Sequence, residues 1–162
     1  FREYFQKKNL KNPVVVSPDA GGTKRAKRFA DMIGAELAVM HKSRPQHQKT
    51  EIVELVGDIE GQTCIIFDDM IDTAGSLVAA KQELIKRGAH KDVYAVATHP
   101  IFSGPAIKRL AKADFKEVVV TDSVPVDPKA FKGLTVLSVA PLLAEVIRHI
   151  ARGQSVTEIY KE

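Results

Sequence analysis

Three aspartates and a turn of small residues stand close together in the stretch CIIFDDMIDTAGS, residues 64–76. Asp68 and Asp69 follow an apolar run, and Asp72 opens the sequence Asp-Thr-Ala-Gly-Ser. Small residues before a helix leave backbone N–H groups free to bind a phosphate. The carboxylates suit hydroxyl groups or a metal ion, so a sugar phosphate would match both parts of the stretch. A helix cap by Asp72 or Ser76 is the simpler alternative, but three acids exceed what a cap requires.

A second candidate site is the stretch SPDAGGTKR, residues 17–25. Its adjacent glycines allow the backbone to approach a ligand closely, and the helix expected after them presents free N–H groups to an anion. A carboxylate at Asp19 beside bound phosphates is usually explained by a Mg²⁺ ion between them. The alternative is a Gly-Gly turn in which Asp19 caps the helix, and the residues alone do not separate the two.

Basic residues gather in the stretch HKSRPQHQKTE, residues 41–51, which carries Lys42, Arg44 and Lys49. The stretch has no apolar period before Ile52, so we expect a mobile loop. Cations on such a loop can stabilise the charge of a phosphoryl group in its transition state. A solvated surface loop is the commoner explanation for any one basic stretch.

The stretch THPIFSGPAIKRL, residues 98–110, offers His99 as a further candidate that could face a ligand. A helix start explains most of the stretch, with Ser103 as the N-cap and Pro105 in the first turn. We therefore prefer the structural interpretation here.

Apolar, β-branched runs without polar alternation recur along the chain, which is typical of strands buried on both faces of a parallel sheet. Helical segments separate them, so we expect a three-layer α/β fold with a mostly parallel central sheet flanked by helices. Ligands bind such sheets at the carboxyl ends of the strands, where the candidate sites fall. The expected strands are 13–17, 36–40, 63–67, 92–98, 117–121 and 133–138, and the expected helices are 22–34, 76–89, 104–113 and 139–153, the last of which should close the domain.

The composition fits one soluble domain of 162 residues, 44% of them hydrophobic, with a net charge of +4. No apolar run is long enough to span a bilayer and the first residues do not form a signal peptide, so no membrane partner is expected. The chain starts without Met, which suggests a fragment of a longer protein. The single cysteine, Cys64, lies in an apolar run and indicates a core position in a cytoplasmic protein. Dispersed basic residues and the absence of Trp argue against a nucleic acid partner.

Several common motifs are absent from the sequence. Neither GxxxxGKS nor GxxxxGKT occurs, which excludes a P-loop, and no GxGxxG follows the first expected strand, so a dinucleotide site is unsupported. No CxxC or HExxH offers a zinc site.

Taken together, the motifs resemble the ribose-phosphate pyrophosphokinase family, also called phosphoribosyl-diphosphate synthetases. IIFDDMIDTAGS is similar to the phosphoribosyl-diphosphate signature of the type I phosphoribosyltransferase fold. VVVSPDAGGTKRA, HKSRP, VGDIEGQTCIIFDDMIDTAG, THPIFSGPAI and VVVTDSVP occur in the family's order and spacing. The resemblance covers nearly the whole chain, but only the C-terminal half of a two-domain protein. It implies a single phosphoribosyltransferase-like domain, residues 1–162, whose N-terminal half would precede Phe1 and is absent from this chain.

The resemblance implies transfer of a diphosphoryl group from Mg-ATP to the 1-hydroxyl of ribose 5-phosphate, giving AMP and phosphoribosyl diphosphate for nucleotide biosynthesis. On this basis Lys42 is the catalytic lysine, Arg44 is its partner and also binds ribose 5-phosphate, and Asp19 belongs to the Mg²⁺ site. The family's ATP-binding residues and metal-site histidine lie in the absent half, so we expect the isolated chain to be inactive. The family is usually a hexamer, so a homo-oligomer is expected. The residues assigned to ribose 5-phosphate are Asp68, Asp69, Asp72, Thr73, Ala74, Gly75 and Ser76.

The resemblance also bears on the C-terminal segment and on the basic loop. GQSVTEIY near the C-terminus is similar to a segment of an allosteric phosphate or ADP site, which makes Ser155, Val156 and Thr157 regulatory candidates. The family's basic loop often reads Lys-Arg-Arg, whereas residues 42–44 read Lys-Ser-Arg, so the middle cation is missing and both catalytic cations remain.

Other function classes fit the residues less well. A non-catalytic regulatory or interaction subunit of the same family would keep the fold and lose the site, whereas Lys42, Arg44, Asp68, Asp72 and Gly75 are all present. A phosphoribosyltransferase would need a base-binding hood, and none is recognisable. An aspartyl phosphatase would need acids at alternate positions, not adjacent ones. A response-regulator-like acidic pocket would leave the phosphate-binding turn unexplained.

Overall fold

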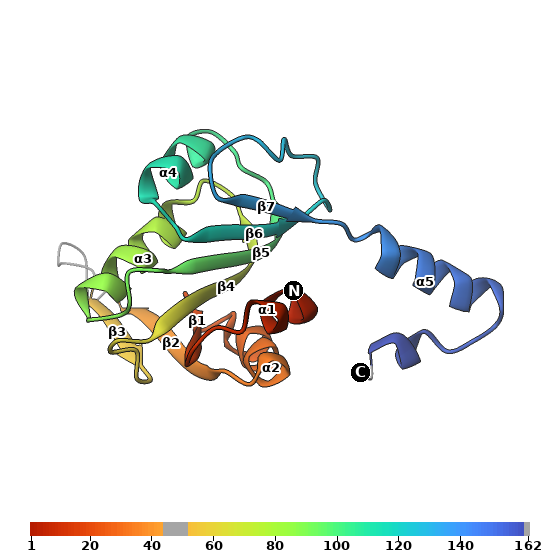
Figure 1. Cartoon of the computed structure of the whole chain (residues 1–162), viewed down its shortest axis with the longest axis horizontal. Coiled ribbons are helices and arrows are strands. Elements are labelled where there is room, and N and C mark those ends of the chain that lie inside the picture. The colour runs from red at the N-terminus through yellow and green to blue at the C-terminus, as the bar shows by residue number, and fades with distance from the viewer. Residues whose placement is uncertain (44–51, 161–162) are drawn as a thin grey trace.

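The central sheet has seven strands in the order β3-β2-β1-β4-β5-β6-β7 (Figure 1). In this computed structural model, which describes residues 1–43 and 52–160, neighbouring strands are parallel except β2 and β3, which are antiparallel. The strands are β1 Pro13–Ser17, β2 Glu36–Ser43, β3 Ile52–Val56, β4 Thr63–Ile71, β5 Tyr94–Pro100, β6 Glu117–Thr121 and β7 Leu134–Leu137. The helices are α1 Arg2–Lys8, α2 Thr23–Ile33, α3 Gly75–Lys86, α4 Ala106–Ala113, α5 Ala140–Ala151 and the 3₁₀ helix η1 Val156–Tyr160.

The direction in which strands are added reverses between β1 and β4, which lie side by side in the sheet. After β1 the chain adds β2 and β3 on one side, and after β4 it adds β5, β6 and β7 on the other. The two strands are parallel and pair Val16 with Ile66, so the loops that follow them leave the same edge of the sheet. A switch of this kind is where α/β sheets bind ligands. The fold therefore brings the stretches after β1 and β4 to the expected binding edge.

Successive residues of the central strands belong to different hydrophobic clusters, one on each face of the sheet. Val16 is in the same cluster as Leu84 of α3 and Leu110 of α4. Val15 is in the other cluster, with Phe29 of α2. This arrangement confirms the predicted three-layer α/β fold, because helices cover the sheet on both sides and its strands are buried between them.

The expected core position of Cys64 is also confirmed. The residue is fully buried in β4, and burial raises the pKa of its thiol to about 12. A thiol with such a pKa stays protonated near neutral pH and is a poor nucleophile.

Several element boundaries differ from the prediction. The stretch expected to be a loop from residue 41 begins inside β2, so Lys42 lies in a strand and pairs with Val53 of β3, a strand that the sequence pattern did not reveal. β4 does not end before the acids but continues through them to Ile71. Helix α1 was missed because its sequence is mostly polar, and its buried residue is Phe5. In each case pairing or packing with distant residues decides the structure.

Helix α5 does not close the domain as predicted. Figure 1 shows α5 extending away from the sheet beyond β7. None of its residues is buried, and Leu143, Ile147 and Ile150 are 53%, 65% and 64% exposed. The apolar spacing of this segment predicted a helix with an apolar face but not the surface that would cover it. Within the described residues, neither α5 nor any other helix is long and apolar enough to cross a membrane.

Candidate functional site

A cavity of about 340 Å³ lies where the strand order switches, at the carboxyl ends of β1 and β4. One wall comes from the loop after β1, and the rest comes from the end of β4, the turn after it and the start of α3. The predicted residues that line it are Asp19, Asp68, Asp69, Asp72, Thr73, Ala74 and Ser76. The structure thus brings together two sequence stretches that were predicted separately to bind phosphate.

The turn before α3 is not a conventionally capped helix start. Ala74 is the N-cap residue, no side chain makes a capping hydrogen bond, and its backbone is left-handed with a φ of 59°. The alternative in which Asp72 or Ser76 caps the helix is therefore wrong. The first amides of an α-helix have no partner within the helix, so those of α3 are available to an anion in the cavity.

The loop after β1 is held by its own side chains. The fully buried Ser17 donates from Oγ to the carbonyl of Asp19 at 2.7 Å, and the amide of Gly22 donates to Asp19 Oδ1 at 2.8 Å. This second bond holds the Gly-Gly turn, but Asp19 is not the helix cap of the alternative, because Gly22 is the N-cap of α2 and no side chain makes a capping hydrogen bond. Asp19 nevertheless lines the cavity, and no hydrogen bond from the described residues reaches its Oδ2.

Asp68 and Asp69 are neighbours in β4 with different surroundings. Asp69 forms an ion pair with Arg25 of α2 at 2.9 Å. Asp68 accepts the backbone amide of Asp69 on Oδ1 at 2.8 Å. Burial, reinforced by the negative charges of Asp69 and Asp19, raises the pKa of Asp68 to about 6. A carboxyl group with that pKa binds a proton or a hydroxyl donor readily near neutral pH.

Two residues that the sequence did not assign to the site contact its turn. Ser103 Oγ donates to Asp72 Oδ1, and Arg109 Nη1 in α4 donates to the carbonyl of Thr73 at 3.0 Å. Ser103 is therefore not the N-cap of α4, a position held by Pro105. No local pattern could have revealed these contacts, because they join the turn after β4 to residues that follow β5 in the loop and in α4.

The remaining catalytic candidates lie elsewhere. His99 is the next-to-last residue of β5, not part of the loop, and its Nδ1 is 3.0 Å from Ser123 Oγ. It does not line the cavity. Lys42 lies near the end of β2, and Arg44 lies outside the described residues.

The regulatory candidates lie beyond α5, in a part of the chain that extends away from the sheet (Figure 1). Val156 and Thr157 begin η1, and the carbonyl of Ser155 is 2.9 Å from Nδ1 of His149. Up to residue 160, where the described part of this segment ends, no feature identifies a ligand.

A magnesium ion at the cavity would have few ligands from this chain. Among residues 1–43 and 52–160, no group of three or more His, Cys, Asp or Glu could hold a metal ion. Mg²⁺, however, is commonly held by one or two carboxylates together with substrate phosphates and water. The carboxylate of Asp19, with an Oδ2 that the described residues leave free, fits one ligand of such a shared site.

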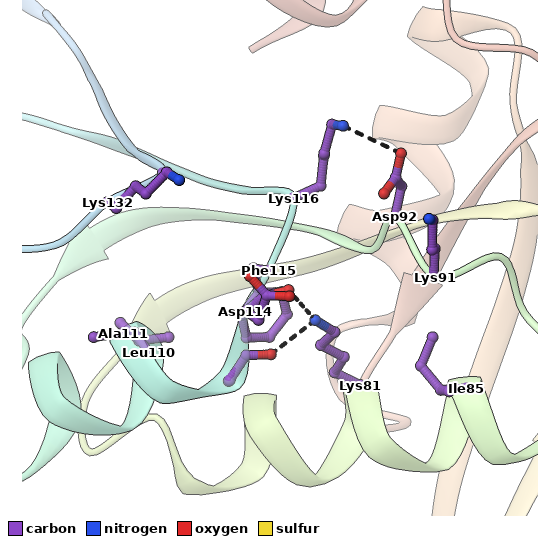
Figure 2. Close-up of a pocket in the computed structure, with 12 residues that line it drawn as sticks. Lys81, Ile85, Lys91, Asp92, Leu110, Ala111, Asp114, Phe115, Lys116 and Lys132 are labelled. Carbon is purple, nitrogen blue, oxygen red and sulfur yellow. Dashed lines mark hydrogen bonds and ion pairs between the residues drawn. The ribbon is translucent and has the colours of Figure 1, made fainter.

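A larger cavity, of about 700 Å³, lies at the opposite edge of the sheet (Figure 2). Figure 2 shows Lys81 directed at the end of α4, where it donates to the carbonyls of Ala113 and Asp114. Lys116 pairs there with Asp92 at 3.3 Å. Lys81 and Lys116 thus neutralise the negative end of α4 and the charge of Asp92. No predicted site residue lines this cavity. The smaller cavity is therefore the candidate site.

Comparisons with known proteins identify the family of the chain. Residues 43–161 match the family described as the phosphoribosyl synthetase-associated domain. The chain is 48% identical over 160 residues to a ribose-phosphate pyrophosphokinase of Helicobacter hepaticus, covering 99% of this chain and 51% of the relative. A crystal structure of phosphoribosylpyrophosphate synthetase from Mycobacterium smegmatis superposes with a TM-score of 0.80 at 42% identity, over 93% of this chain and 48% of that one. APRTase from Giardia lamblia shares the fold alone, with a TM-score of 0.58 at 14% identity over 74% of this chain and 77% of that one. The chain spans about half the length of the curated relatives it matches.

Proposed function

The chain belongs to the ribose-phosphate pyrophosphokinase family, and we propose that it is the ribose 5-phosphate-binding half of such an enzyme. The complete enzyme would transfer the diphosphoryl group of ATP to the 1-hydroxyl of ribose 5-phosphate. The products would be phosphoribosyl diphosphate and AMP, in a cytoplasmic step of nucleotide biosynthesis.

The observation that carries the proposal is the position of the turn between β4 and α3. Its uncapped amides and the half-buried carboxyl of Asp68 line one cavity at the switch of strand order. A sugar phosphate has a phosphate that can accept hydrogen bonds from these amides and hydroxyls that can donate to the carboxyl of Asp68. We place the 5-phosphate on residues 72–76 and the ribose hydroxyls against Asp68 and Asp69. The ion pair with Arg25 would hold the Asp69 carboxylate in place.

Transfer of the diphosphoryl group develops negative charge that cations can stabilise, with little covalent chemistry by the protein. We assign this role to Lys42 and Arg44. β2 is parallel to β1, so Lys42 near the end of β2 approaches the same edge of the sheet as Asp19. A Mg²⁺ ion held in part by Asp19 would neutralise charge on the ATP phosphates.

The proposal also includes a second half of the protein, which would precede Phe1 and bind ATP. The curated relatives are about twice as long as the segment that matches this chain. We therefore expect the chain alone to bind ribose 5-phosphate without turnover, and the complete enzyme to be a homo-oligomer, a hexamer as in the family that the chain resembles.

Phosphorus NMR of the chain with ribose 5-phosphate tests the binding half of this proposal. We expect the sugar-phosphate resonance to broaden and shift with protein concentration. Asp72→Asn should weaken that response, whereas Asp31→Asn, near the carboxyl end of α2 where Asp31 pairs with Lys27, should leave it unchanged. Addition of Mg-ATP should give no AMP. Absence of any response in the wild-type chain would refute the ribose 5-phosphate site, and turnover would refute the need for a second half.

A further inference from the structure

The turn that binds phosphate in the proposed function is fastened to the next loop of the sheet. β4 and β5 pair as far as Ile71 and Pro100, and the contacts continue beyond the strands. The amide of Phe102 donates to the carbonyl of Ile71 at 3.0 Å, and the amide of Ser103 donates to the carbonyl of Asp72 at 3.1 Å. Ser103 adds the bond from its Oγ to Asp72 Oδ1. The start of the turn is thus held by backbone and side-chain bonds from one short segment.

Arg109 holds the next residue of the turn from a different element. Its Nη1 donates to the carbonyl of Thr73 at 3.0 Å from the first turn of α4. A Cβ added to Gly75 would lie 3.4 Å from this same nitrogen. The guanidinium therefore lies against the backbone at the start of α3, and a side chain at Gly75 would have to fit beside it.

The turn needs this support because its backbone is strained. Ala74 has a φ of 59°, a left-handed conformation that residues with a side chain seldom occupy because the Cβ approaches the following carbonyl oxygen. Phe102, which bonds to the turn from the other loop, has a φ of 48°. Strained conformations of this kind persist where neighbouring contacts enforce them.

We propose that Ser103 and Arg109 are positioning residues that hold the 72–76 turn in the conformation that binds the 5-phosphate. Neither residue lines the cavity, so both act through the turn. This inference rests on the proposed function, since it assumes that the turn binds the phosphate. It gives a role to Ser103 in the loop after β5 and to Arg109 in α4, two elements that lie outside the sequence motif of the turn.

The test compares ribose 5-phosphate with inorganic phosphate as ligands of the same chain. Ser103→Ala and Arg109→Met should each weaken both ligands by a similar factor, about tenfold, the scale of one hydrogen bond lost from a preorganised site. Asp68→Asn, by contrast, should weaken ribose 5-phosphate far more than inorganic phosphate, because that side chain faces the sugar. Dissociation constants from titration calorimetry at constant ionic strength give these factors.

Matched variants show whether weaker binding comes from a misplaced turn, from the loss of a positive charge or from partial unfolding. Lys108→Met removes a cation from the exposed side of the same helix and should change neither affinity. Arg109→Lys keeps the charge and one donor and should recover part of the lost affinity. The double variant Ser103→Ala with Arg109→Met should lose less than the product of the two single factors, because both act on one turn. Thermal unfolding of each variant should stay within a few degrees of the wild type.

Failure of the positioning role and failure of the proposed ribose 5-phosphate site give different results. If the wild-type chain binds ribose 5-phosphate and the Ser103 and Arg109 variants bind it equally well, the positioning role is wrong and the site stands. If Arg109→Met weakens binding only as much as Lys108→Met does, the effect is general charge and the role is again wrong. If the wild-type chain binds neither ligand, the proposed function fails and this inference fails with it.

Discussion

Asp68 and Asp69 are joined by a hydrogen bond from the amide of one to the carboxylate of the other, yet only Asp69 has a cationic partner among the described residues. Arg25 neutralises Asp69 at 2.9 Å, while the pKa of Asp68 rises to about 6 because of burial and adjacent negative charge. Of these two acids, Asp69 thus has its charge balanced within the fold, whereas Asp68 has no cationic partner among the described residues. Asp68 is therefore the acid of the pair to which a ligand hydroxyl would contribute most.

Asp68→Asn should therefore make the unliganded chain more stable above pH 6. An acid whose folded pKa lies above its ordinary value of 3.8 costs stability once it ionises, and the cost is absent at low pH. The shift in pKa from 3.8 to about 6 would by itself correspond to about 3 kcal/mol of stability. We reduce this to about 1 kcal/mol because the carboxyl group is partly exposed to solvent. Urea denaturation of both proteins at pH 7.5 and pH 4 measures it. A gain that is the same at both pH values would contradict the electrostatic cause.

Glu117→Gln should have an effect of the opposite sign and destabilise the chain near neutral pH. Burial alone would raise the pKa of Glu117, but hydrogen bonds from Lys8, Thr135 and Tyr4 outweigh it and lower the pKa below 4.5. Such a group stabilises the fold above its ordinary pKa, and the effect is lost as the pH falls through the lowered value. We expect the free energy of unfolding to drop by about 1 kcal/mol at pH 7, with the difference shrinking below pH 4.5. The exposed Glu60→Gln is the control, and an equal loss in that variant would exclude this role for the network.

Gly22→Ala should destabilise the loop after β1. An added Cβ would lie 2.9 Å from Oγ of Ser17, which is fully buried and cannot move freely. We expect a loss of about 1–3 kcal/mol, typical of overpacking. Chemical denaturation of Gly22→Ala, Ser17→Ala and the double variant measures the coupling, and the double variant should recover part of the loss. Gly21→Ala is the milder control, since its Cβ would lie 3.3 Å from the carboxylate of Asp19. A larger effect at Gly21 would show that the close contact with Ser17 is not the cause.

Lys42→Ala in the complete enzyme should lower turnover by roughly 10²–10⁴-fold, the effect of losing one preorganised charge contact in the transition state. The affinity for ribose 5-phosphate should change much less, because the proposed sugar site lies after β4 and not on β2. Steady-state kinetics with both substrates separate the two effects. Lys91→Ala, in the cavity at the opposite edge of the sheet, is the matched control. Near-normal turnover of Lys42→Ala would remove this lysine from the proposed mechanism.

Much of the fold was predictable because the signals are local. Continuous β-branched runs such as 14–16 indicate strands buried on both faces, and Val15 and Val16 indeed belong to clusters on opposite faces of the sheet. The small residues of the 72–76 turn indicated an anion site without reference to any distant residue, and the structure places that turn in a cavity with Asp19.

The parts that were missed depend on contacts between distant residues. β3 is specified by pairing with β2, and α1 by the burial of Phe5 among aromatic residues of other elements. Ser103 carries the local pattern of a helix cap but bonds instead to Asp72, which lies 31 positions away in the chain. Arg109 carries no pattern at all. Contacts of this kind depend on the sheet order, which a periodicity in one segment cannot reveal.

The exposed position of α5 has a consequence for how the chain unfolds. A helix of 12 residues with no buried side chain has little beyond its own hydrogen bonds to hold it, and helices of that length are marginal in water. Its amide protons should exchange with solvent far faster than those of β1 and β4, in the middle of the sheet. Loss of α5 would then precede the main transition, so circular dichroism at 222 nm and a probe in the core should report different midpoints. The chain would contain two cooperative units, and a single free energy of unfolding would describe only the sheet and the helices packed on it.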